Sequence, residues 1–364
     1  MILFNDLKKK YLYLQKEIDN ACKKVLRSGR YILEKETEGF EKKFAQYLGA
    51  KYCAGVGNGL EALQIALMAL NIKEGDEVIT TPYSMAASTL AIKMVGAIPV
   101  FVDIDNYFHI DADKIEEKIT SRTKAILPVH LFGQMAEMEK IKKIAKRHNL
   151  FLVEDAAQAH GARYKDKKAG TFGDIGCFSF YPTKNLGTFG DGGAIVTNNK
   201  KLYEKCKMIR NYGQKNRYEH ELCGLNSRLD EIHAAILSVD LKYLNKFNLI
   251  RKNLAKIYSL KLKNIKEIKL PEIRIHADHI FHAFTIEVER RQDLISFLAK
   301  NKIPTFIYYP IPIHKQKCFS GFNHLDFPIT EKKSKKVLSL PIHPFLESKD
   351  IAYISQKIAK FYEV

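Results

Sequence analysis

The residues that decide the fold are 174–193, DIGCFSFYPTKNLGTFGDGG. A β-rich run, Ile175–Tyr181, ends at Pro182, and the turn residues that follow leave one basic side chain, Lys184, at the end of the predicted strand. The glycines after it allow backbone to approach a bulky ligand closely, and Ser179 adds a hydroxyl group nearby. Most lysines are solvated surface charges, but this setting makes Lys184 our candidate for a reactive amine.

A second stretch, FLVEDAAQAHGA at 151–162, ends a buried apolar strand with Asp155 and then presents Gln158 and His160. An acid at the end of one strand and a lysine at the end of the next suit pyridoxal phosphate. The acid keeps the pyridine nitrogen protonated, and the lysine forms a Schiff base with the aldehyde. We therefore expect Asp155 and Lys184 to act on this cofactor together.

Residues 51–70, KYCAGVGNGLEALQIALMAL, predict a short strand, a glycine-rich turn and a helix. The turn places the backbone N–H groups of Gly59 and Leu60 at a helix N-terminus, where the helix dipole favours a phosphate. A GNG sequence alone more often marks only a tight turn. The presence of a pyridoxal-type lysine in the same chain favours the phosphate site.

Strand-like and helix-like runs alternate over residues 77–151, which predicts βαβ units and a mostly parallel sheet covered by helices. A chain of 364 residues exceeds what one core usually covers. We expect a large α/β domain at 1–245 and a small C-terminal α+β domain at 246–364. A helix that starts at Ser227 and runs past Leu260 would link them, and residues 305–309, TFIYY, would form a strand.

Three motifs carry a resemblance to a known family: EDAAQAHG, SFYPTKNLGTFGDGGAIVTN and GLNSRLDEIHAA. The chain resembles the DegT-type sugar-nucleotide aminotransferases nearly end to end, from FNDLKKKY to YYPIPIH. The resemblance implies the fold of the fold type I pyridoxal phosphate enzymes and a two-stage amino transfer. L-Glutamate would replace Lys184 in the Schiff base and leave as 2-oxoglutarate, and the freed lysine would move the proton. A keto sugar nucleotide would then take up the amino group.

The resemblance also implies roles for individual residues, with Lys184, Asp155 and His160 catalytic. The residues expected to bind the cofactor are Gly59, Leu60, Met85, Asp155, Gln158, Ser179, Lys184 and Asn226. The residues expected to face the substrate are His160, Tyr181, Arg217 and Tyr309. Met85 stands where relatives carry an aromatic residue that stacks on the cofactor ring, a departure that leaves Tyr83 as the alternative. Asn226 would reach the cofactor phosphate of the neighbouring subunit, which implies a homodimer with shared active sites.

Shorter sequence motifs bear on which carbon of the sugar receives the amino group. GNGLEAL, AQAHGA and NSRLDE resemble the branch that aminates C3 of a dTDP-linked 3-keto-6-deoxyhexose, which implies a dTDP-3-amino-3,6-dideoxyhexose for glycans such as lipopolysaccharide. Relatives in this branch often carry His-Tyr-Pro where this chain has Tyr308, Tyr309 and Pro310. The alternative is a C4 aminotransferase acting on a nucleotide-linked 4-keto-6-deoxyhexose. A family dehydratase is disfavoured because that branch replaces the lysine.

Composition bears on partners and compartment. The formal net charge of +18 raises nucleic acid as a partner, but the lysines are spread along helix-like stretches, so we expect solvated helix faces and no nucleic-acid or membrane binding. The six cysteines have no metal-ligand spacing, which predicts buried reduced thiols in a cytoplasmic protein. The nearest approach to a histidine metal site is HADHIFH, residues 276–282, which is more typical of a surface or strand, and we expect no metal.

Overall fold

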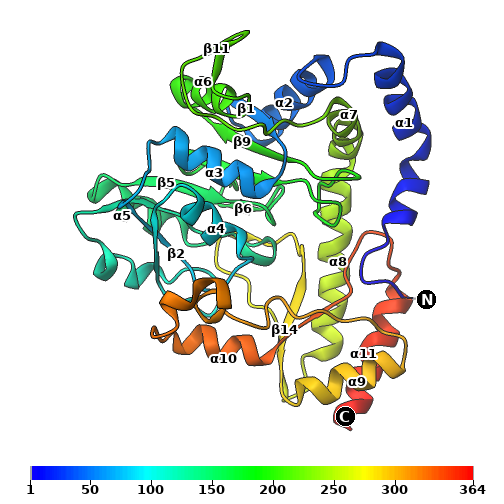
Figure 1. Cartoon of the computed structure of the whole chain (residues 1–364). Helices are drawn as coiled ribbons and strands as arrows, with labels where there is room; N and C mark the ends of the chain where they lie inside the picture. Colours follow the sequence, from blue (N-terminus) through cyan, green and yellow to red (C-terminus); the bar gives the residue numbers. More distant parts are fainter. Residues whose placement is uncertain (1, 364) are drawn as a thin grey trace.

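A computed structural model describes residues 2–363, and its main feature is a seven-stranded sheet (Figure 1). The strand order is β1-β9-β8-β5-β4-β2-β3, and of these strands β9 runs antiparallel to both of its neighbours. The strands are β1 (Tyr52–Val56), β2 (Glu77–Thr80), β3 (Ile98–Phe101), β4 (Thr123–Ile126), β5 (Phe151–Asp155), β8 (Ile175–Ser179) and β9 (Gly193–Thr197). The other pairings from β8 to β3 are parallel, so the expected α/β fold with a mostly parallel central sheet is confirmed.

Helices cover both faces of this sheet because the strands carry apolar residues on both sides. Ile126 and Leu152 pack in the core that includes residues of α2, α5 and α7. Ala125 and Val153, their chain neighbours, pack in the core on the opposite face with α3, α4 and α6. The helices are α1 (Leu7–Ser28), α2 (Lys35–Leu48), α3 (Gly59–Ala69), α4 (Ala87–Met94), α5 (Met138–Arg147), α6 (Lys200–Ile209) and α7 (Glu231–Asp240).

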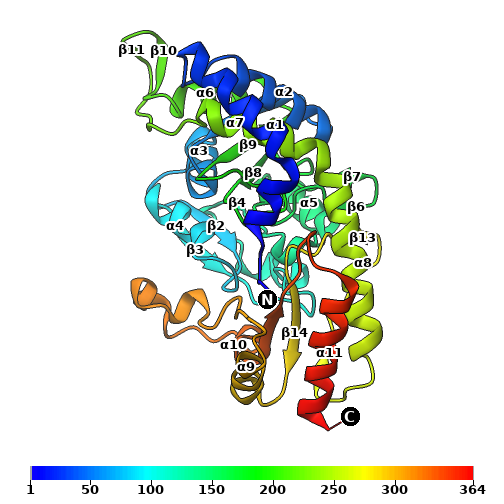
Figure 2. The same cartoon turned by 90° about the vertical axis from the view of Figure 1, so that its right-hand side faces the viewer.

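A separate core lies in the C-terminal part of the chain. Its antiparallel sheet consists of β12 (Ile268–Lys269), β14 (Phe284–Val288) and β15 (Val337–Leu340). The surrounding helices are α8 (Leu244–Leu262), α9 (Arg291–Lys300), α10 (Pro328–Lys336) and α11 (Ser348–Tyr362). Figure 1 shows α8 running from the large sheet down to the level of α9 and α11, and Figure 2 shows α8 beside α11. Tyr258 of α8 belongs to this core, whereas Phe247 packs with α1 and α7, so one helix joins both parts.

The helix expected from Ser227 past Leu260 is divided in the structure. It comprises α7, a 3₁₀ turn at Leu241–Tyr243, and α8. The first turn of α7 also contacts α2, since the Glu231 carboxylate accepts hydrogen bonds from the backbone N–H groups of Glu34, Glu36 and Thr37. One acidic side chain at the first turn of α7 therefore satisfies the free donors at the start of α2.

The strand expected at residues 305–309 is absent from the described sheets. Phe306 makes an isolated bridge to Ser339, and the backbone then turns to the buried Tyr83 side chain. The Tyr83 hydroxyl donates to the carbonyl of Tyr308 at 2.9 Å and accepts from the N–H of Tyr309 at 2.9 Å. These backbone groups are bonded to a side chain, so they cannot extend a β ladder.

The remaining described features are small. Short strands pair as β10 (Gln214–Asn216) with β11 (Glu219–His220), and as β13 (Ala277–Asp278) with β6 (Arg163–Tyr164) and β7 (Lys167–Lys168). Within residues 2–363, no helix is long and apolar enough to cross a membrane, and no group of three or more His, Cys, Asp or Glu side chains could hold a metal ion. The cysteines are not all buried as expected, because Cys223 and Cys318 are exposed.

Candidate active site

Lys184 lies in a tight turn directly after β8. The turn is closed by two backbone hydrogen bonds: the N–H of Lys184 donates to the carbonyl of Tyr181, and the N–H of Thr188 donates to the carbonyl of Phe180, both at 2.9 Å. Pro182 within the turn has no backbone N–H, which prevents β8 from continuing. The lysine is therefore presented at the carboxyl edge of the parallel strands, where α/β proteins place their ligands.

The peptide groups of Gly187 hold this turn to α1 and α7. The Lys10 ammonium donates to the Gly187 carbonyl at 3.0 Å, and the Gly187 N–H donates to Asp240 Oδ2 at 3.1 Å. Lys10 and Asp240 form a buried ion pair at 2.7 Å, so each satisfies the charge of the other. A side chain at Gly187 would lie 2.7 Å from the Tyr181 carbonyl oxygen, which explains the glycine.

Asp155 ends β5, the strand beside β8, and pairs in register with Cys177. Its carboxylate is buried and fixed, since Oδ2 accepts from the Ser88 hydroxyl at 2.7 Å and Oδ1 accepts from the Ala157 N–H at 3.1 Å. Burial lowers the pKa of the Lys184 ammonium to about 8, and the negative charge of Asp155 acts in the opposite direction. The structure thus places the fixed Asp155 carboxylate close enough to raise the pKa of the Lys184 amine, which is partly neutral near pH 8.

The first turn of α3 offers free N–H groups. Asn58 caps the helix by accepting from the Glu61 N–H at 2.9 Å, while the N–H groups of Gly59 and Leu60 have no partner among residues 2–363. The Ser179 side chain packs directly against Gly59, where an added Cβ would lie 2.7 Å from the serine Cβ. Two backbone donors, a hydroxyl and the positive end of a helix dipole therefore meet at one anion-binding turn.

Gln158 joins the large sheet to Tyr309. Its side-chain oxygen accepts from the Phe132 N–H at 2.8 Å, and its amide nitrogen donates to the Tyr309 hydroxyl at 3.1 Å. Burial raises the pKa of Tyr309, and the Asp155 carboxylate contributes to the same direction. Both side chains thus lie near the carboxylate.

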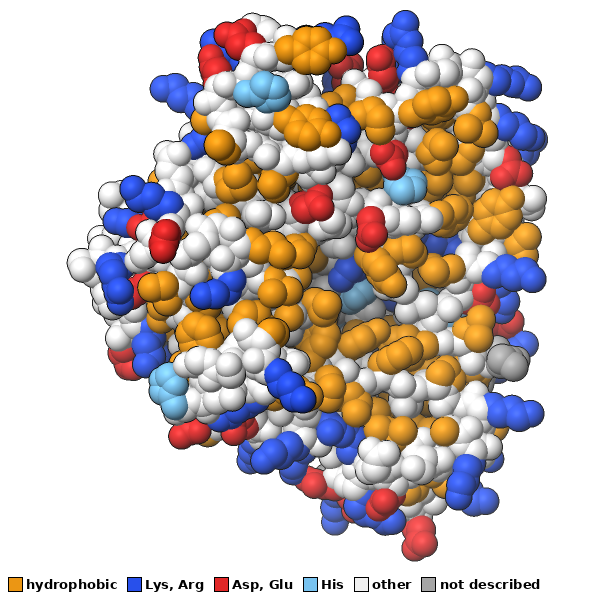
Figure 3. Space-filling view, viewed as in Figure 1, with side chains coloured by type: hydrophobic (Ala, Val, Ile, Leu, Met, Phe, Trp, Pro, Cys, Tyr) orange, Lys and Arg blue, Asp and Glu red, His pale blue; other side chains and the backbone are white. Residues whose placement is uncertain are grey.

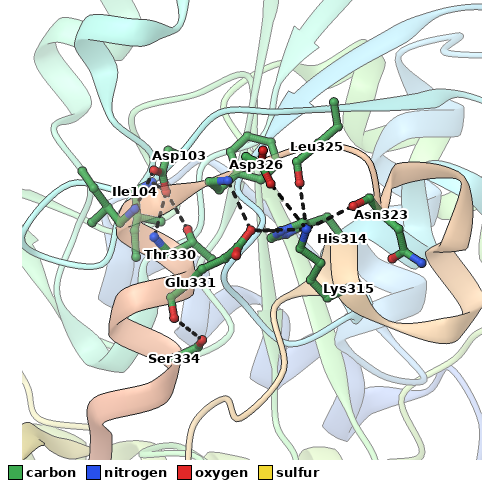
Figure 4. A network of polar contacts seen from close by, with 12 residues as sticks. Asp103, Ile104, His314, Lys315, Asn323, Leu325, Asp326, Thr330, Glu331 and Ser334 are labelled. Atoms are coloured by element: carbon green, nitrogen blue, oxygen red, sulfur yellow. Dashed lines mark hydrogen bonds and ion pairs between the residues drawn. The ribbon is translucent and has the colours of Figure 1, made fainter.

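A polar network holds the chain segment that follows Tyr309 (Figure 4). Asp103, two residues after β3, accepts from the Thr330 N–H at 3.0 Å and from the Thr330 hydroxyl at 2.7 Å. The buried His314 ring bonds Glu331 at 3.0 Å, which ties the segment to α10. The segment is therefore attached to α10, and α10 is in turn bonded to Asp103 beside the large sheet.

These features fit pyridoxal phosphate. The anion-binding turn at Gly59 matches a phosphate monoester, the Asp155 carboxylate can accept a hydrogen bond from a protonated ring nitrogen, and Lys184 is a partly neutral primary amine. All three groups lie at the carboxyl ends of β1, β5 and β8.

The match to a family model decides the identity. Residues 12–359 match the model of the DegT/DnrJ/EryC1/StrS aminotransferase family. The chain belongs to this family. It is accordingly a pyridoxal phosphate-dependent sugar aminotransferase.

Relatives of this DegT-family enzyme are similar over their full length. The dTDP-3-amino-3,6-dideoxy-α-D-galactopyranose transaminase of Aneurinibacillus thermoaerophilus is 48% identical over 362 residues, which cover 99% of each chain. The dTDP-3-amino-3,4,6-trideoxy-α-D-glucose transaminase of Streptomyces venezuelae is 44% identical over 94% of this chain and 92% of its own. Among solved structures, S. venezuelae DesV in complex with a ketimine intermediate superposes with a TM-score of 0.98 at 43% identity, covering 100% of this chain and 99% of its own.

The structure corrects the expectation that His160 of this aminotransferase faces the sugar. The imidazole has no exposed surface and packs against Phe178 and Phe180, with ring centroids 5.4 and 5.8 Å away. Burial lowers its pKa to about 3, with Lys184 contributing, so the ring is neutral at pH 7. A ring without accessible atoms cannot contact a substrate, and we exclude His160 from the catalytic and sugar-binding groups.

The side chains expected above the cofactor differ in exposure. Tyr83, the alternative ring-stacking residue, is completely buried and holds the Tyr308–Tyr309 backbone, so it cannot stack on a ligand. Met85 is 56% exposed and Tyr181 is 52% exposed, so both reach the protein surface. Met85 therefore remains the candidate for packing on the ring.

Two expected site residues are exposed at the surface of this chain. Arg217 is exposed between β10 and β11, with its guanidinium 5.2 Å from the Tyr218 ring centroid. Asn226 is exposed, although the hydroxyl of its neighbour Ser227 accepts from the Gly57 N–H at 3.0 Å, close to the start of α3. Among residues 2–363 of one chain, no hydrogen bond or ion pair joins either side chain to Lys184 or Asp155.

One further residue of the site was not predicted from the sequence. Ser88 donates the 2.7 Å hydrogen bond that fixes the Asp155 carboxylate. In the sequence it is only one of the hydroxyl residues in the PYSMAAS stretch, for which the prediction names Tyr83 and Met85 alone.

Proposed function

We propose that this enzyme transfers an amino group from L-glutamate to C3 of a dTDP-linked 3-keto-6-deoxyhexose. The product would be a dTDP-3-amino-3,6-dideoxyhexose for glycan biosynthesis, such as that of lipopolysaccharide. The observation that carries the proposal is the 48% identity, over 99% of both chains, to a transaminase named for a dTDP-3-amino-3,6-dideoxyhexose. The free N–H groups of α3 and the Lys184–Asp155 arrangement supply the chemistry that such a transfer needs.

Lys184 moves the proton in this proposal. Pyridoxal phosphate, when bound, supplies an aldehyde carbon that exchanges amines and a ring that withdraws electrons from the carbon bearing the amine. With a pKa of about 8, the Lys184 amine exists in both protonation states near neutral pH, so it can accept a proton from one carbon and return it to another. The bonds at Gly187 limit how far its backbone can move between the two stages.

The other groups of the pocket bind and orient. The Asp155 carboxylate, held by Ser88 and Ala157, keeps a negative charge at a fixed position without reorganisation during the reaction. The N–H groups of Gly59 and Leu60 with the Ser179 hydroxyl would hold the phosphate, and Gln158 with Tyr309 would close one side of the pocket. Tyr181 and Met85, both exposed, would contact the sugar and the ring.

We propose that a second copy of the chain completes the site. Large apolar side chains are exposed along α1 and in the segments beside it, namely Leu7, Leu12, Leu26, Tyr31, Ile32 and Phe189. Figure 3 shows such side chains gathered at the upper right, over α1. Exposed apolar patches mark contact surfaces. A partner at this surface would bring its Asn226 and Arg217 to the active site of the first chain. The net positive charge of the chain would attract the nucleotide diphosphate of the substrate.

The test of the reaction is a substrate panel. Purified enzyme is incubated with glutamate and with dTDP-linked 3-keto and 4-keto 6-deoxyhexoses, and the position of the new amine is read by NMR. The reverse reaction, from the dTDP-3-amino sugar and 2-oxoglutarate, supplies an independent measurement. Preferred amination at C3 supports the proposal, whereas higher kcat/KM on the 4-keto sugar would establish the C4 alternative in its place.

The test of the shared site is complementation. Lys184→Ala chains are mixed with Asn226→Ala chains under conditions that exchange subunits. In a hybrid dimer one site lacks both groups and the other has both, so activity should return to a measurable fraction of the wild-type value. Mixtures that stay as inactive as the separate variants, or an active wild-type monomer in sedimentation analysis, would rule out the shared site.

A further inference from the structure

A second group of buried polar side chains contacts the Lys184 turn from the C-terminal part of the chain. Asn185, the residue after Lys184, is 4% exposed and bonds two residues far along the chain, Asn248 of α8 and His282 just before β14. Neither partner touches Gly187, so this contact is independent of Lys10 and Asp240. The turn is thus held from two sides, by Lys10 and Asp240 at Gly187 and by Asn248 and His282 at Asn185.

The direction of each hydrogen bond in this group is determined. The Asn248 amide nitrogen donates to the His160 backbone carbonyl at 2.9 Å, which leaves the Asn248 oxygen toward Asn185. The Asn185 amide nitrogen donates to that oxygen at 2.7 Å and to the Ile280 carbonyl at 3.3 Å. A carbonyl can only accept, so neither amide can be flipped without losing these bonds.

The same logic assigns the tautomer of His282. The Asn185 oxygen faces His282 Nδ1 at 3.1 Å and can only accept, so Nδ1 carries the proton. Burial lowers the pKa of His282 well below its usual range, and the positive charges of Lys184 and Arg251 act in the same direction, as do His160 and His279. The ring is therefore neutral, with its Nε2 unprotonated.

We propose that Asn185, Asn248 and His282 form a directed chain of hydrogen bonds that positions Lys184, with His282 Nδ1 as the required donor at its end. His282 is a positioning residue in this inference, since it acts on the lysine through Asn185. The chain of bonds also links α8 and the start of β14 to the lysine turn, so the C-terminal core contributes to holding the reactive amine. This inference rests on the proposed role of Lys184.

Two substitutions of His282 separate its nitrogen atoms. In His282→Asn the side-chain amide can occupy the place of Nδ1 and donate to Asn185, whereas the Nε2 position is lost. In His282→Gln the end of the side chain reaches the Nε2 position, and the donor to Asn185 is lost. His276→Gln, at an exposed histidine of the same HADHIFH stretch, serves as the control.

The first readout is the rate of each half-reaction in single turnover. His282→Gln should slow both stages by about tenfold to a hundredfold, the loss expected when a reacting group is misplaced by a fraction of an ångström to an ångström. His282→Asn should stay within about threefold of the wild type, and so should His276→Gln. Equal losses in His282→Asn and His282→Gln would overturn the proposal.

The second readout does not depend on turnover. In enzyme loaded with pyridoxamine phosphate the lysine is free, and its acetylation by acetic anhydride can be followed against pH by peptide mass spectrometry. The midpoint for Lys184, expected near 8, should rise by about one unit in His282→Gln, because a loosened turn admits water and relieves the effect of burial. An unchanged midpoint with only a lower Tm indicates a structural role and overturns the proposal.

Two further measurements cover the cases in which His282→Gln fails to fold or Lys184 does not carry the cofactor. If His282→Gln does not fold, Asn248→Leu removes the other end of the chain of bonds and replaces it with a side chain of similar shape that cannot form hydrogen bonds, and it should raise the midpoint likewise. Borohydride reduction of the wild-type enzyme, followed by peptide mapping, must place the cofactor on Lys184. A cofactor found on another lysine would refute the proposed function itself, and this is visible before any variant is made.

Discussion

The two sides of the active site differ in how their residues are held. On the cofactor side, Asp155 accepts two hydrogen bonds, Gly187 is bonded through both of its peptide groups, and Asn58 caps α3. On the substrate side, Tyr181 is more than half exposed. The groups proposed for proton transfer are therefore fixed by hydrogen bonds within one chain, whereas the side chain proposed to contact the sugar lies at the protein surface.

The largest expected effect comes from removing the reactive amine on the cofactor side. Lys184→Ala should lower kcat by about ten-thousandfold or more, because the nucleophile and the proton carrier are lost together. The variant should still bind pyridoxal phosphate noncovalently through the turn at Gly59, which equilibrium dialysis would show. Activity within tenfold of the wild type would mean that another lysine performs the transfer.

Neutralising the fixed carboxylate should have the next largest effect. Asp155→Asn can keep the hydrogen bond from Ser88 but cannot balance a positive ring nitrogen, so kcat should fall about a hundredfold to a thousandfold. Both half-reactions should slow, since the charge acts on the cofactor and not on one substrate. Loss confined to the sugar stage would instead place Asp155 among the substrate contacts.

The pH profile should reveal the amine on the cofactor side. Lys184 accepts a proton only when neutral, and its pKa is about 8, so the single-turnover rate with glutamate should rise about tenfold per pH unit below 8 and level off above it. The Asp155 carboxylate raises this pKa, so the midpoint should move to lower pH in Asp155→Asn. A midpoint that stays fixed in that variant would assign the titration to a different group.

The smallest expected effect concerns His160, whose side chain is buried in the core. His160→Asn should lower stability by about 1–3 kcal/mol, because a polar amide would replace an imidazole packed against Phe178 and Phe180. The two half-reactions should change alike and by less than about threefold. Thermal unfolding measures the first effect, and selective slowing of the sugar stage would restore His160 to the substrate side.

The difference between the two sides also explains what the sequence could predict. That Lys184 and Asp155 lie close together could be predicted, because Asp155 ends one apolar strand, Lys184 lies in the turn after the next, and parallel neighbouring strands bring their carboxyl ends together. The anion-binding turn at Gly59 was visible for the same reason, as a strand, a glycine-rich turn and a helix in direct succession.

The sequence-based predictions were wrong where the direction of a side chain or a contact between distant segments determines the structure. His160 lies five residues after Asp155, but the turn that carries it directs the ring into the core between two phenylalanines. Residues 305–309 look like a strand, yet a buried tyrosine takes up their backbone groups. The bonds of Ser88 to Asp155 and of His282 to Asn185 join segments far apart in the sequence, which local patterns cannot reveal.

The sheet order has a consequence for synthesis on the ribosome. In the seven-stranded sheet β1 pairs with β9 and with no other strand, although residues 57–192 are made between them. The strand that leads into the turn before α3 thus emerges early and has no sheet partner until more than half of the chain has left the exit tunnel. A nascent chain in this interval exposes the unpaired edge of a strand. Such edges can pair with other chains and cause aggregation, which chaperones prevent.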